Sequence, residues 1–542
     1  MIQPYDDNNN AGGGYNSTGS IDDPPDDDKS MNNNARDGPL GGVDPNLQTR
    51  RHRLVIFGLI VVALIAGAAI AVPMLLDDCD CPSVSTRALT FPPSTAPETK
   101  APITPQTAAP NVPPTNAPTA APVTSMPTAT PSSQPSFAPT TDDIRQIIEL
   151  VAIPVSGEAA VTDRSGAPYR AAEYLVTDTF SRSGALGVAQ LRERYALIVF
   201  YYSMNGDNWS ACSRDDILCP SGNAWLDNTV NHCTWNSVTC DANTGFVTGI
   251  AFTTTNGNNI EGPIPPEIGE FEFLTTLGIT NDKVTGPLPL ELNELTNLRE
   301  LILTNNEIGG PISNDFLIGS RSSSLQRIYM SGNQLSGPIP ASMGQFTTLI
   351  ELILSNNQLD GVIPEQLNQM TNLGTLNLSN NNLRGALTSG VYILNLELLD
   401  LSNNPDLRDT LNGPALTNMA FLNTIRLANT NVGGNLPSQL FQRPIKELDL
   451  ENADFSGPIS SEFANLALSA QIINLSNNAF TGAFPDVFDD MLLLNELQVH
   501  GTDLTGEMSA AVCSRRGEGK EQVRVLSADC NELTCTCCTQ CF

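Results

Sequence analysis

Histidines are the first residues to consider for chemistry, because imidazole is the commonest general base and metal ligand near neutral pH. The chain has three, His52, His232 and His500, and none lies in a catalytic or metal-binding spacing. The sequence also lacks a nucleophile elbow, a phosphate-binding loop and a paired-histidine zinc motif. We therefore predict no catalytic residues, no bound metal and no cofactor, and we expect His500 at the molecular surface.

Carboxylates form the sharpest local feature of the sequence. Glu447, Asp449 and Glu451 are two residues apart, so on a β-strand their side chains share one face. Such an acidic strip suits a basic peptide or a cation. The alternative is a solvated face with no ligand. The formal net charge of -31 excludes nucleic acid as an expected partner, because nucleic acid binding needs clustered Lys and Arg to neutralise phosphates.

A repeat with a period of 23 to 27 residues positions these side chains. Eleven units begin at Val247, Leu274, Leu298, Leu325, Leu349, Leu373, Leu396, Leu422, Ile445, Ala470 and Leu494, and each unit is named below by the number of its first residue. In unit 349 the alternation of Leu352 and Leu354 predicts a short strand with both side chains inward, while Glu351 and Ile353 point outward. No unit buries its apolar side alone, so neighbouring units must stack.

The outward strand positions predict the ligand-binding residues, because the strands of such a solenoid line its concave face. These candidates are Glu300, Arg327, Tyr329, Glu351, Asp400, Arg426, Glu447, Asp449, Glu451, Glu496 and His500.

Two further repeated positions have structural explanations. Asn357 can satisfy backbone groups at the turn that leaves the strand, and its equivalents predict a buried ladder. These are Asn306, Asn333, Asn381, Asn404 and Asn478. Gly361 permits a tight second turn, and nine other units have a glycine at the same place.

An uncharged run of 23 residues, 54–76, predicts a membrane-spanning helix of about 35 Å. The alternative, a cleaved signal peptide, fits poorly because 53 polar residues precede the run. Arg50, Arg51 and Arg53 precede it, which predicts a cytosolic N-terminus and an extracellular C-terminus at the plasma membrane. Residues 1–53 are expected to form a disordered acidic tail.

Residues 77–141 are rich in Pro, Thr and Ser and predict an extended extracellular stalk, either O-glycosylated or an unmodified linker. Cys79 and Cys81 at its start suggest a covalent homodimer, with palmitoylation or pairing to the caps as alternatives. Asn208, Asn377 and Asn474 are predicted N-glycosylation sites.

The other ten cysteines lie at the two ends of a cysteine-free middle, which predicts disulfide-bonded caps in an oxidising compartment. The C-terminal cap, 513–542, contains Cys513, Cys530, Cys535, Cys537, Cys538 and Cys541. Six cysteines allow fifteen pairings, and the sequence does not choose among them. A zinc cluster is the alternative at this end, disfavoured because no histidine is nearby.

The repeat ending L-x-G-x-I-P resembles plant-type leucine-rich repeats of receptor-like proteins without a kinase domain. The resemblance covers 205–542 and implies an α/β solenoid, a right-handed superhelix of about eleven repeats over 247–512. The stretch C-T-W-N-S-V-T-C-D resembles the N-terminal cap of that family and implies a disulfide between Cys233 and Cys240. Cys212 and Cys219 have the same spacing and would form an additional pair, with Trp225 and Trp235 covering the first repeat.

The predicted cap, 142–246, begins with a helical segment that resembles single-span repeat proteins of diatom algae. We therefore expect an integral membrane protein of the cell surface that binds a protein, peptide or glycan. A membrane co-receptor would have to carry any signal, because the tail cannot hold an enzyme domain. The alternatives are a structural tether between wall and membrane, and an inhibitor of a secreted hydrolase.

Overall fold

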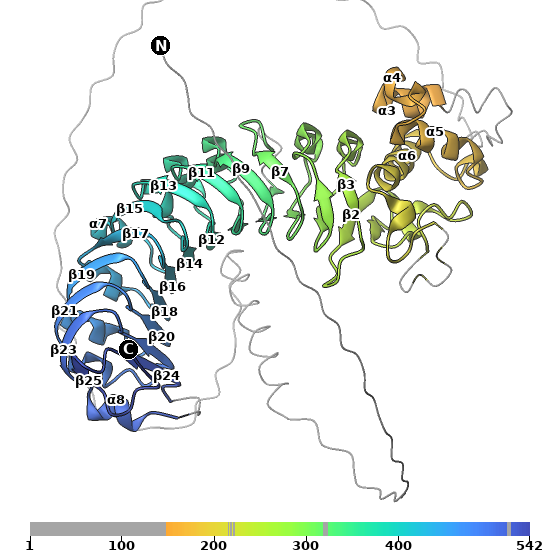
Figure 1. Ribbon diagram of the computed structural model, residues 1–542. Helices are drawn as coiled ribbons and strands as arrows, with labels where there is room; N and C mark the ends of the chain where they lie inside the picture. Colours follow the sequence, from red (N-terminus) through yellow and green to blue (C-terminus); the bar gives the residue numbers. More distant parts are fainter. Residues whose placement is uncertain (1–147, 215, 217–218, 220–222, 318–323, 518–521) are drawn as a thin grey trace, which may run out of the picture. The chain divides into compact units, whose positions relative to one another are not determined.

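A computed structural model describes residues 148–542, except 215, 217–218, 220–222, 318–323 and 518–521 (Figure 1). The predicted cytosolic tail, membrane span and stalk, together with Cys79 and Cys81, lie outside the described residues. Within the described part of the chain, no helix has the length and apolar character needed to cross a membrane.

Short helices form the start of the described chain. They are η1 (Ile148–Ala152), α3 (Ile153–Ser156), α4 (Glu158–Thr162), α5 (Ala167–Thr177), η2 (Ser181–Ser183), α6 (Val188–Ser203), η3 (Gly206–Asn208) and η4 (His232–Thr234). Helix α6 is the centre of this N-terminal cap, because its residues from Glu193 to Tyr201 are all buried. Phe200 of α6 stacks on Phe252 with ring centroids 6.3 Å apart, which joins the cap to the first repeat.

A sheet of fourteen strands runs through the repeats that the structure describes. In order they are β1 (Val238–Cys240), β2 (Val247–Phe252), β4 (Thr276–Ile279), β6 (Glu300–Ile302), β8 (Arg327–Tyr329), β10 (Glu351–Ile353), β12 (Thr375–Asn377), β14 (Leu398–Asp400), β16 (Thr424–Arg426), β18 (Glu447–Asp449), β20 (Ile472–Asn474), β22 (Glu496–Gln498), β24 (Val525–Ala528) and β26 (Gln540–Cys541). Only the β1–β2 pair is antiparallel among these described strands. The sheet lines the inner side of the arc in Figure 1.

A second row of short parallel strands follows the first turn of most units. It contains β7 (Gly309–Pro311), β9 (Gln334–Pro338), β11 (Gln358–Gly361), β13 (Asn382–Gly385), β15 (Asp406–Thr410), β17 (Asn431–Gly434), β19 (Asp454–Pro458), β21 (Ala479–Ala483), β23 (Asp503–Glu507) and β25 (Leu533–Thr534). The separate pair of β3 (Glu261–Pro263) and β5 (Lys283–Thr285) continues this row toward the cap.

Single turns of 3-10 helix complete most units, where the L-x-G-x-I-P pattern ends. They are η5 (Pro266–Glu270), η6 (Leu290–Glu294), η8 (Ala341–Gln345), η9 (Glu365–Gln369), η10 (Ser389–Val391), η11 (Ser438–Gln442), η12 (Ser461–Leu466) and η13 (Asp486–Phe488), with α7 (Gly413–Leu416) and α8 (Ala510–Ser514) in place of a 3-10 turn.

The inward leucines form one continuous core along the solenoid. Leu352 and Leu354 are fully buried, as the alternation predicts, and Leu352 pairs in register with Ile328 and Leu376 of the flanking strands. Each unit therefore places its apolar residues directly on those of its neighbours, and the core is buried by stacking alone.

The predicted asparagine ladder is confirmed. Asn357 Nδ2 donates to the carbonyls of Met330, Leu354 and Ser355 at 2.9, 3.0 and 3.2 Å, and its Oδ1 accepts the Leu335 N–H at 3.0 Å. Each amide therefore satisfies backbone groups of its own unit and of the preceding one. Asn306, Asn333, Asn381, Asn404 and Asn478 make the same set of bonds.

The ladder is interrupted in the C-terminal half. Ala453 occupies the ladder position of unit 445 and has no polar side chain. The Val432 N–H, which an asparagine there would accept, donates instead to Thr430 Oγ1 at 3.3 Å. Thr430 in turn donates to the Leu427 carbonyl at 2.7 Å. Its hydroxyl therefore makes some of the backbone hydrogen bonds that two ladder asparagine amides make in other units.

A second row of asparagines was not predicted. Residues such as Asn356, one position before the ladder, are exposed and have a left-handed backbone, with φ 56° at Asn356. Asparagine tolerates this conformation better than other side chains, and Gly332 and Gly501 replace it in two units. The row is therefore explained by backbone geometry. The predicted turn glycine, Gly361, also has positive φ, at 77°.

The cap cysteines pair as disulfides. Cys233 bonds to Cys240, as the resemblance implied, and Cys212 bonds to Cys219, as their equal spacing suggested. The structure also selects one of the fifteen C-terminal pairings, which joins Cys513 to Cys537, Cys530 to Cys541 and Cys535 to Cys538. All six sulfurs are therefore used in disulfides, which contradicts the alternative of a zinc cluster. Trp225 is fully buried and packs on Phe252 of the first repeat.

The ladder gives a direct stability prediction. Replacing Asn357 by Ala leaves the buried Leu335 N–H without its partner and removes one of the hydrogen bonds made by each of three carbonyls. The free energy of unfolding should therefore fall by on the order of 3 kcal/mol. The neighbouring substitution Asn356→Gly is the control, because glycine adopts the same backbone at no steric cost. Thermal unfolding followed by circular dichroism should show a lower midpoint for N357A only. Equal midpoints for the two variants would contradict the role of the ladder.

Candidate functional site

The structure places the predicted ligand-binding residues on or next to the strands of the inner sheet, with side chains directed away from the core. All of them are half-buried except Asp400, which is 6% exposed. Because the strands pair in register, side chains at the same position of consecutive units lie side by side. The residues divide into two charged groups and a pair near the C-terminal cap.

The first charged group joins three adjacent strands. Glu300, Arg327 and Glu351 pair in register on β6, β8 and β10. Arg327 Nη1 lies 2.7 Å from Glu300 Oε1, and Arg327 Nε lies 3.6 Å from Glu351 Oε1. Tyr329 donates its hydroxyl to Glu351. Burial and this hydrogen bond raise the pKa of Tyr329 to about 12, so the hydroxyl keeps its proton.

The second charged group repeats this arrangement on β14, β16 and β18. Arg426 binds Glu447 through two bonds of 2.7 and 2.8 Å, and its Nη1 lies 3.5 Å from Asp400 Oδ2. Asp400 also accepts bonds from the Ser402 N–H and hydroxyl. In both groups an arginine is fixed between acidic residues of its two neighbouring strands, which leaves each group with one negative charge in excess.

Asp449 and Glu451 add uncompensated negative charge beside the second group. Neither forms an ion pair with a described residue, and Glu451 Oε2 accepts only the amide of Asn474, at 3.2 Å. Burial raises the pKa of Asp449 to about 6, and the carboxylates of Glu451 and Glu447 act in the same direction. The backbone N–H of Glu451 and the charge of Arg426 oppose this rise. Asp449 and Glu451 therefore carry the negative charge of the predicted acidic strip, whereas the charge of Glu447 is compensated by Arg426.

An apolar stretch lies on the strands of the first charged group, nearer the N-terminal end of the inner sheet. Ile302, Tyr329 and Ile353 occupy the last position of β6, β8 and β10, pair in register and are all half-buried. The inner face thus has an apolar and aromatic part near unit 325 and an acidic part near unit 445.

Glu496 and His500 lie outside both groups. Glu496 accepts a bond from Gln498 of its own strand. His500 stacks on Phe542 with ring centroids 4.0 Å apart, and its Nδ1 lies 2.8 Å from Ser527 Oγ. His500 is therefore half-buried in a contact with the C-terminal cap, rather than free at the surface as expected from the sequence.

The predicted glycosylation sites differ in access. Asn208 is exposed. Asn377 is half-buried on β12, and its Oδ1 accepts bonds from the Ser379 N–H and hydroxyl. Asn474 is 5% exposed and its Nδ2, the atom that carries a glycan, donates to Glu451. A glycan at Asn474 would replace a contact of the acidic part.

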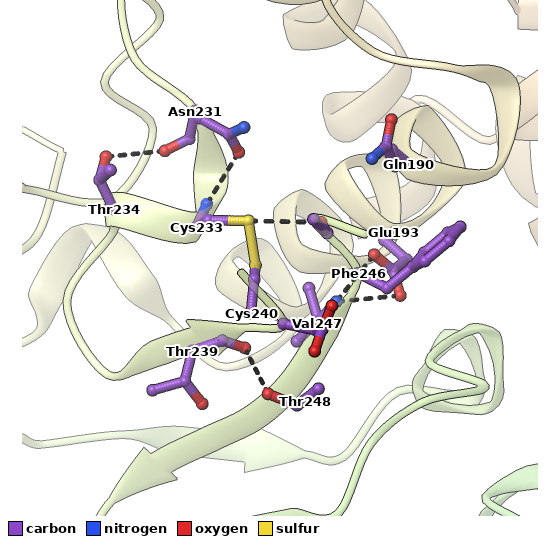
Figure 2. Close-up of a disulfide and its surroundings, with 12 residues drawn as sticks. Gln190, Glu193, Asn231, Cys233, Thr234, Thr239, Cys240, Phe246, Val247 and Thr248 are labelled. Carbon is purple, nitrogen blue, oxygen red and sulfur yellow. Dashed lines mark hydrogen bonds between the residues drawn. A yellow bond between two sulfur atoms is a disulfide. The ribbon is translucent and has the colours of Figure 1, made fainter. Parts of the chain in front are cut away.

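One group of metal-ligand type occurs among the described residues. His232, Cys233 and Cys240 have ligand atoms within 4.8 Å of one another. The two sulfurs are joined at 2.06 Å in the disulfide shown in Figure 2, so they offer no thiolate. Burial and the charge of Arg194 lower the pKa of His232 to about 3, which keeps its ring neutral.

The pairing of charged side chains across neighbouring strands was not predicted from the sequence. Glu300, Arg327 and Glu351 stand 27 and 24 residues apart, yet they become neighbours because they share a position in consecutive units. The alternation of charge at one repeat position was a usable signal. It identifies the first group but not the second, where Arg426 pairs in register with Asp449 and yet binds Glu447.

A model of the leucine-rich repeat matches residues 324–346 and 348–370. These units are leucine-rich repeats. The same strand register extends through the units on both sides, and six units carry the ladder asparagine, so the described chain from β2 to β22 is a leucine-rich-repeat solenoid. The resemblance to plant-type leucine-rich-repeat proteins is confirmed at the level of these repeats. No curated protein matches the sequence.

Solved structures with similar repeats include three plant-type receptors. The plant peptide hormone receptor RGFR1, in complex with RGF2, is 28% identical, with 49% of this chain and 42% of that chain covered and a TM-score of 0.45. A TDR receptor is 21% identical over 50% and 45% of the two chains, with a TM-score of 0.45. The ectodomain of GASSHO1/SCHENGEN3 from Arabidopsis thaliana, in complex with CASPARIAN STRIP INTEGRITY FACTOR 2, is 25% identical over 47% and 33%, with a TM-score of 0.40. The solenoid thus spans less than half the length of each.

The electrostatics of the acidic part can be tested by titration. Asp449 should titrate near pH 6 when its carboxyl carbon is followed by NMR. The substitution Arg426→Gln removes a stabilising positive charge, so the pKa of Asp449 should rise further. Glu451→Gln removes a repulsive charge, so the pKa should fall. A value of about 4 in the unmodified protein, or no response to Arg426→Gln, would contradict the arrangement.

Proposed function

We propose that this solenoid is the recognition domain of a receptor-like protein and binds an extended segment of a peptide or protein across its inner face. The observation that supports this most is the two-part face. A basic side chain fits beside Asp449 and Glu451, which lack a cationic partner among the described residues. An apolar side chain fits against Ile302, Tyr329 and Ile353.

The spacing of the two parts sets the length of the ligand. Strands β8 and β18 are five steps apart in the sheet, and neighbouring strands lie about 4.8 Å apart. The two parts are therefore separated by about 24 Å. An extended chain rises about 3.3 Å per residue, so we propose an apolar residue and a Lys or Arg about seven positions apart.

Half-buried carboxylates give this interaction its selectivity. Asp449 is partly enclosed by its neighbours, so bringing a cation beside it replaces an incompletely solvated charge with an ion pair. Acidic peptides would meet the excess negative charge of both groups and be repelled. Binding should therefore weaken as salt concentration rises and as the pH falls below about 6, where Asp449 takes up a proton.

A selected peptide tests this proposal. A library of ten-residue peptides, each with one apolar and one basic residue at variable spacing, can be selected on the full chain. For the peptides obtained, Asp449→Asn/Glu451→Gln should weaken binding at least tenfold in calorimetry, because two charge-assisted contacts are lost and the Arg426–Glu447 pair remains. Spacings near seven residues should dominate the selection.

The matched control removes two carboxylates from the same unit on another surface. Asp454 and Glu462 are exposed and lie on β19 and η12. Asp454→Asn/Glu462→Gln changes net charge equally and should leave affinity unchanged. Equal weakening by both double variants would show a general charge effect and overturn the assignment of the inner face.

The cellular setting remains part of the proposal. The predicted span at 54–76, the stalk at 77–141 and the disulfide-bonded caps favour a single-pass protein of the plasma membrane with the solenoid outside. A membrane co-receptor is the proposed partner that signals. A tether between wall and membrane, or an inhibitor of a secreted hydrolase, would use the same fold without such a partner.

Proximity labelling from the cytosolic tail separates these alternatives. A labelling enzyme fused before residue 1 should mark kinases or adaptors if the protein acts with a signalling co-receptor. Only bulk membrane proteins should be marked if it is a tether. If the fused labelling enzyme marked extracellular proteins instead, this result would contradict the proposed orientation.

A further inference from the structure

Two buried carboxyl groups hold the junction between the N-terminal cap and the first repeats. We use "cap–repeat junction" for Glu193, Val247, Asn258, Ile260 and Asp282. Glu193 lies on α6 and is 2% exposed. Both of its oxygens accept the N–H of Val247, at 3.3 and 3.0 Å, at the start of β2 (Figure 2). The carboxyl of Glu193 thus links the helical cap to the start of β2.

Asp282 is the second carboxyl and occupies the ladder position of unit 274. Its Oδ1 accepts the N–H groups of Asn258 at 2.7 Å and Ile260 at 2.9 Å, as a ladder asparagine would. Its Oδ2 is buried and has no hydrogen-bond partner. In a ladder asparagine this position is taken by Nδ2, which donates to backbone carbonyls.

The next unit shows what Asp282 Oδ2 faces. Asn306 Nδ2 donates to the carbonyls of Ile279, Leu303 and Thr304, at 2.8, 3.3 and 3.2 Å. Because the repeat is regular, we expect backbone carbonyl oxygens in the same place around Asp282 Oδ2. An ionised oxygen is repelled there, whereas a protonated oxygen becomes a donor and completes the ladder.

Asp282 is also connected to the cap. Asn258, whose N–H it accepts, bonds Ala211 through both ends of its side-chain amide, at 2.8 and 3.1 Å. Ala211 precedes Cys212 of the first disulfide. The carboxyl of Asp282 therefore positions a residue that binds the cap directly.

Few charges are available to stabilise either carboxylate. Around Glu193, Arg194 of α6 is bound to Asp178, and Arg192 donates to the Leu150 carbonyl. On η5, Glu267 accepts a hydrogen bond from the Ser156 hydroxyl, and Glu270 is a second carboxyl group. In the β1–β2 turn, Asp241 is bound by Thr244.

Beside Asp282, Lys283 is exposed and donates to Asn259 Oδ1 at 3.0 Å. Burial raises the pKa of Glu193 to about 8, opposed by the Val247 N–H. Burial also raises the pKa of Asp282, opposed by three backbone N–H groups and the charge of Lys283.

We propose that the cap–repeat junction is a pH-sensitive device in which protonated Glu193 and Asp282 hold the cap in place and their ionisation loosens it. The folded state binds these protons more tightly than the unfolded chain does. Their contribution to stability is therefore complete in acid, below the ordinary carboxyl pKa of about 4, and is lost as the pH rises through the folded values. This device is independent of the proposed ligand face, because it uses none of its residues.

Hydrogen exchange measured by mass spectrometry on the full chain tests the device. Glu193→Gln/Asp282→Asn keeps both side chains neutral and nearly the same shape. Between pH 5 and 8, the protection of segments that contain Val247 and 258–260 should fall in the unmodified chain relative to this variant. The fall should reach up to about tenfold per pH unit for each group. Segments around Thr375–Asn377 serve as the internal reference and should show no such change.

The reciprocal variant uses the next ladder position. Asn306→Asp should make exchange at Val284, whose N–H Asn306 accepts, newly dependent on pH. A constant protection ratio between the unmodified chain and the double variant across this pH range would overturn the proposal. A pH-independent N306D would overturn the part assigned to Asp282. Loss of peptide binding in the Asp449/Glu451 variant leaves both outcomes unaffected.

Discussion

The hydrogen bonds of the buried asparagine ladder are the interaction on which the rest of the molecule depends. A solenoid built from strands of three or four residues must turn its backbone inside its own core, where unpaired N–H and C=O groups are costly. Asn357 and its equivalents satisfy those groups between neighbouring units. The register that results is what places Arg327 between Glu300 and Glu351.

The ladder also explains why function and stability can occupy opposite sides of one strand. Leu352 and Leu354 face the core, while Glu351 and Ile353 face outward, so the outer positions can change without loss of packing. Such freedom permits an apolar part near Tyr329 and an acidic part near Asp449 on the same sheet. Asp400 is an exception. It is buried by its own contacts, so its role is to position Arg426 and not to contact a ligand.

Much of this fold could be predicted from the sequence, because period, leucine alternation and ladder asparagines are local patterns. The Cys233–Cys240 pairing came from a resemblance, and the C-terminal pairing needed coordinates, since Cys535, Cys537 and Cys538 are nearly adjacent. The candidate face was predicted as a list of residues. Its organisation was not, because the charge of Glu447 is compensated by Arg426, which lies 21 residues away in the sequence. Glu193 and Asp282 were missed for the same reason.

The interruption of the ladder at Ala453 has a mechanical consequence. Each inner strand is bonded only to its two neighbours, so tension along the solenoid axis passes through every interface in series. Under such a load the units separate one at a time, beginning where the fewest bonds resist. Unit 445 lacks the side-chain bonds of the ladder and should yield first, between two stretches that remain folded. Three disulfides tie the C-terminal cap, so a pulled molecule would first extend within the C-terminal half of the solenoid.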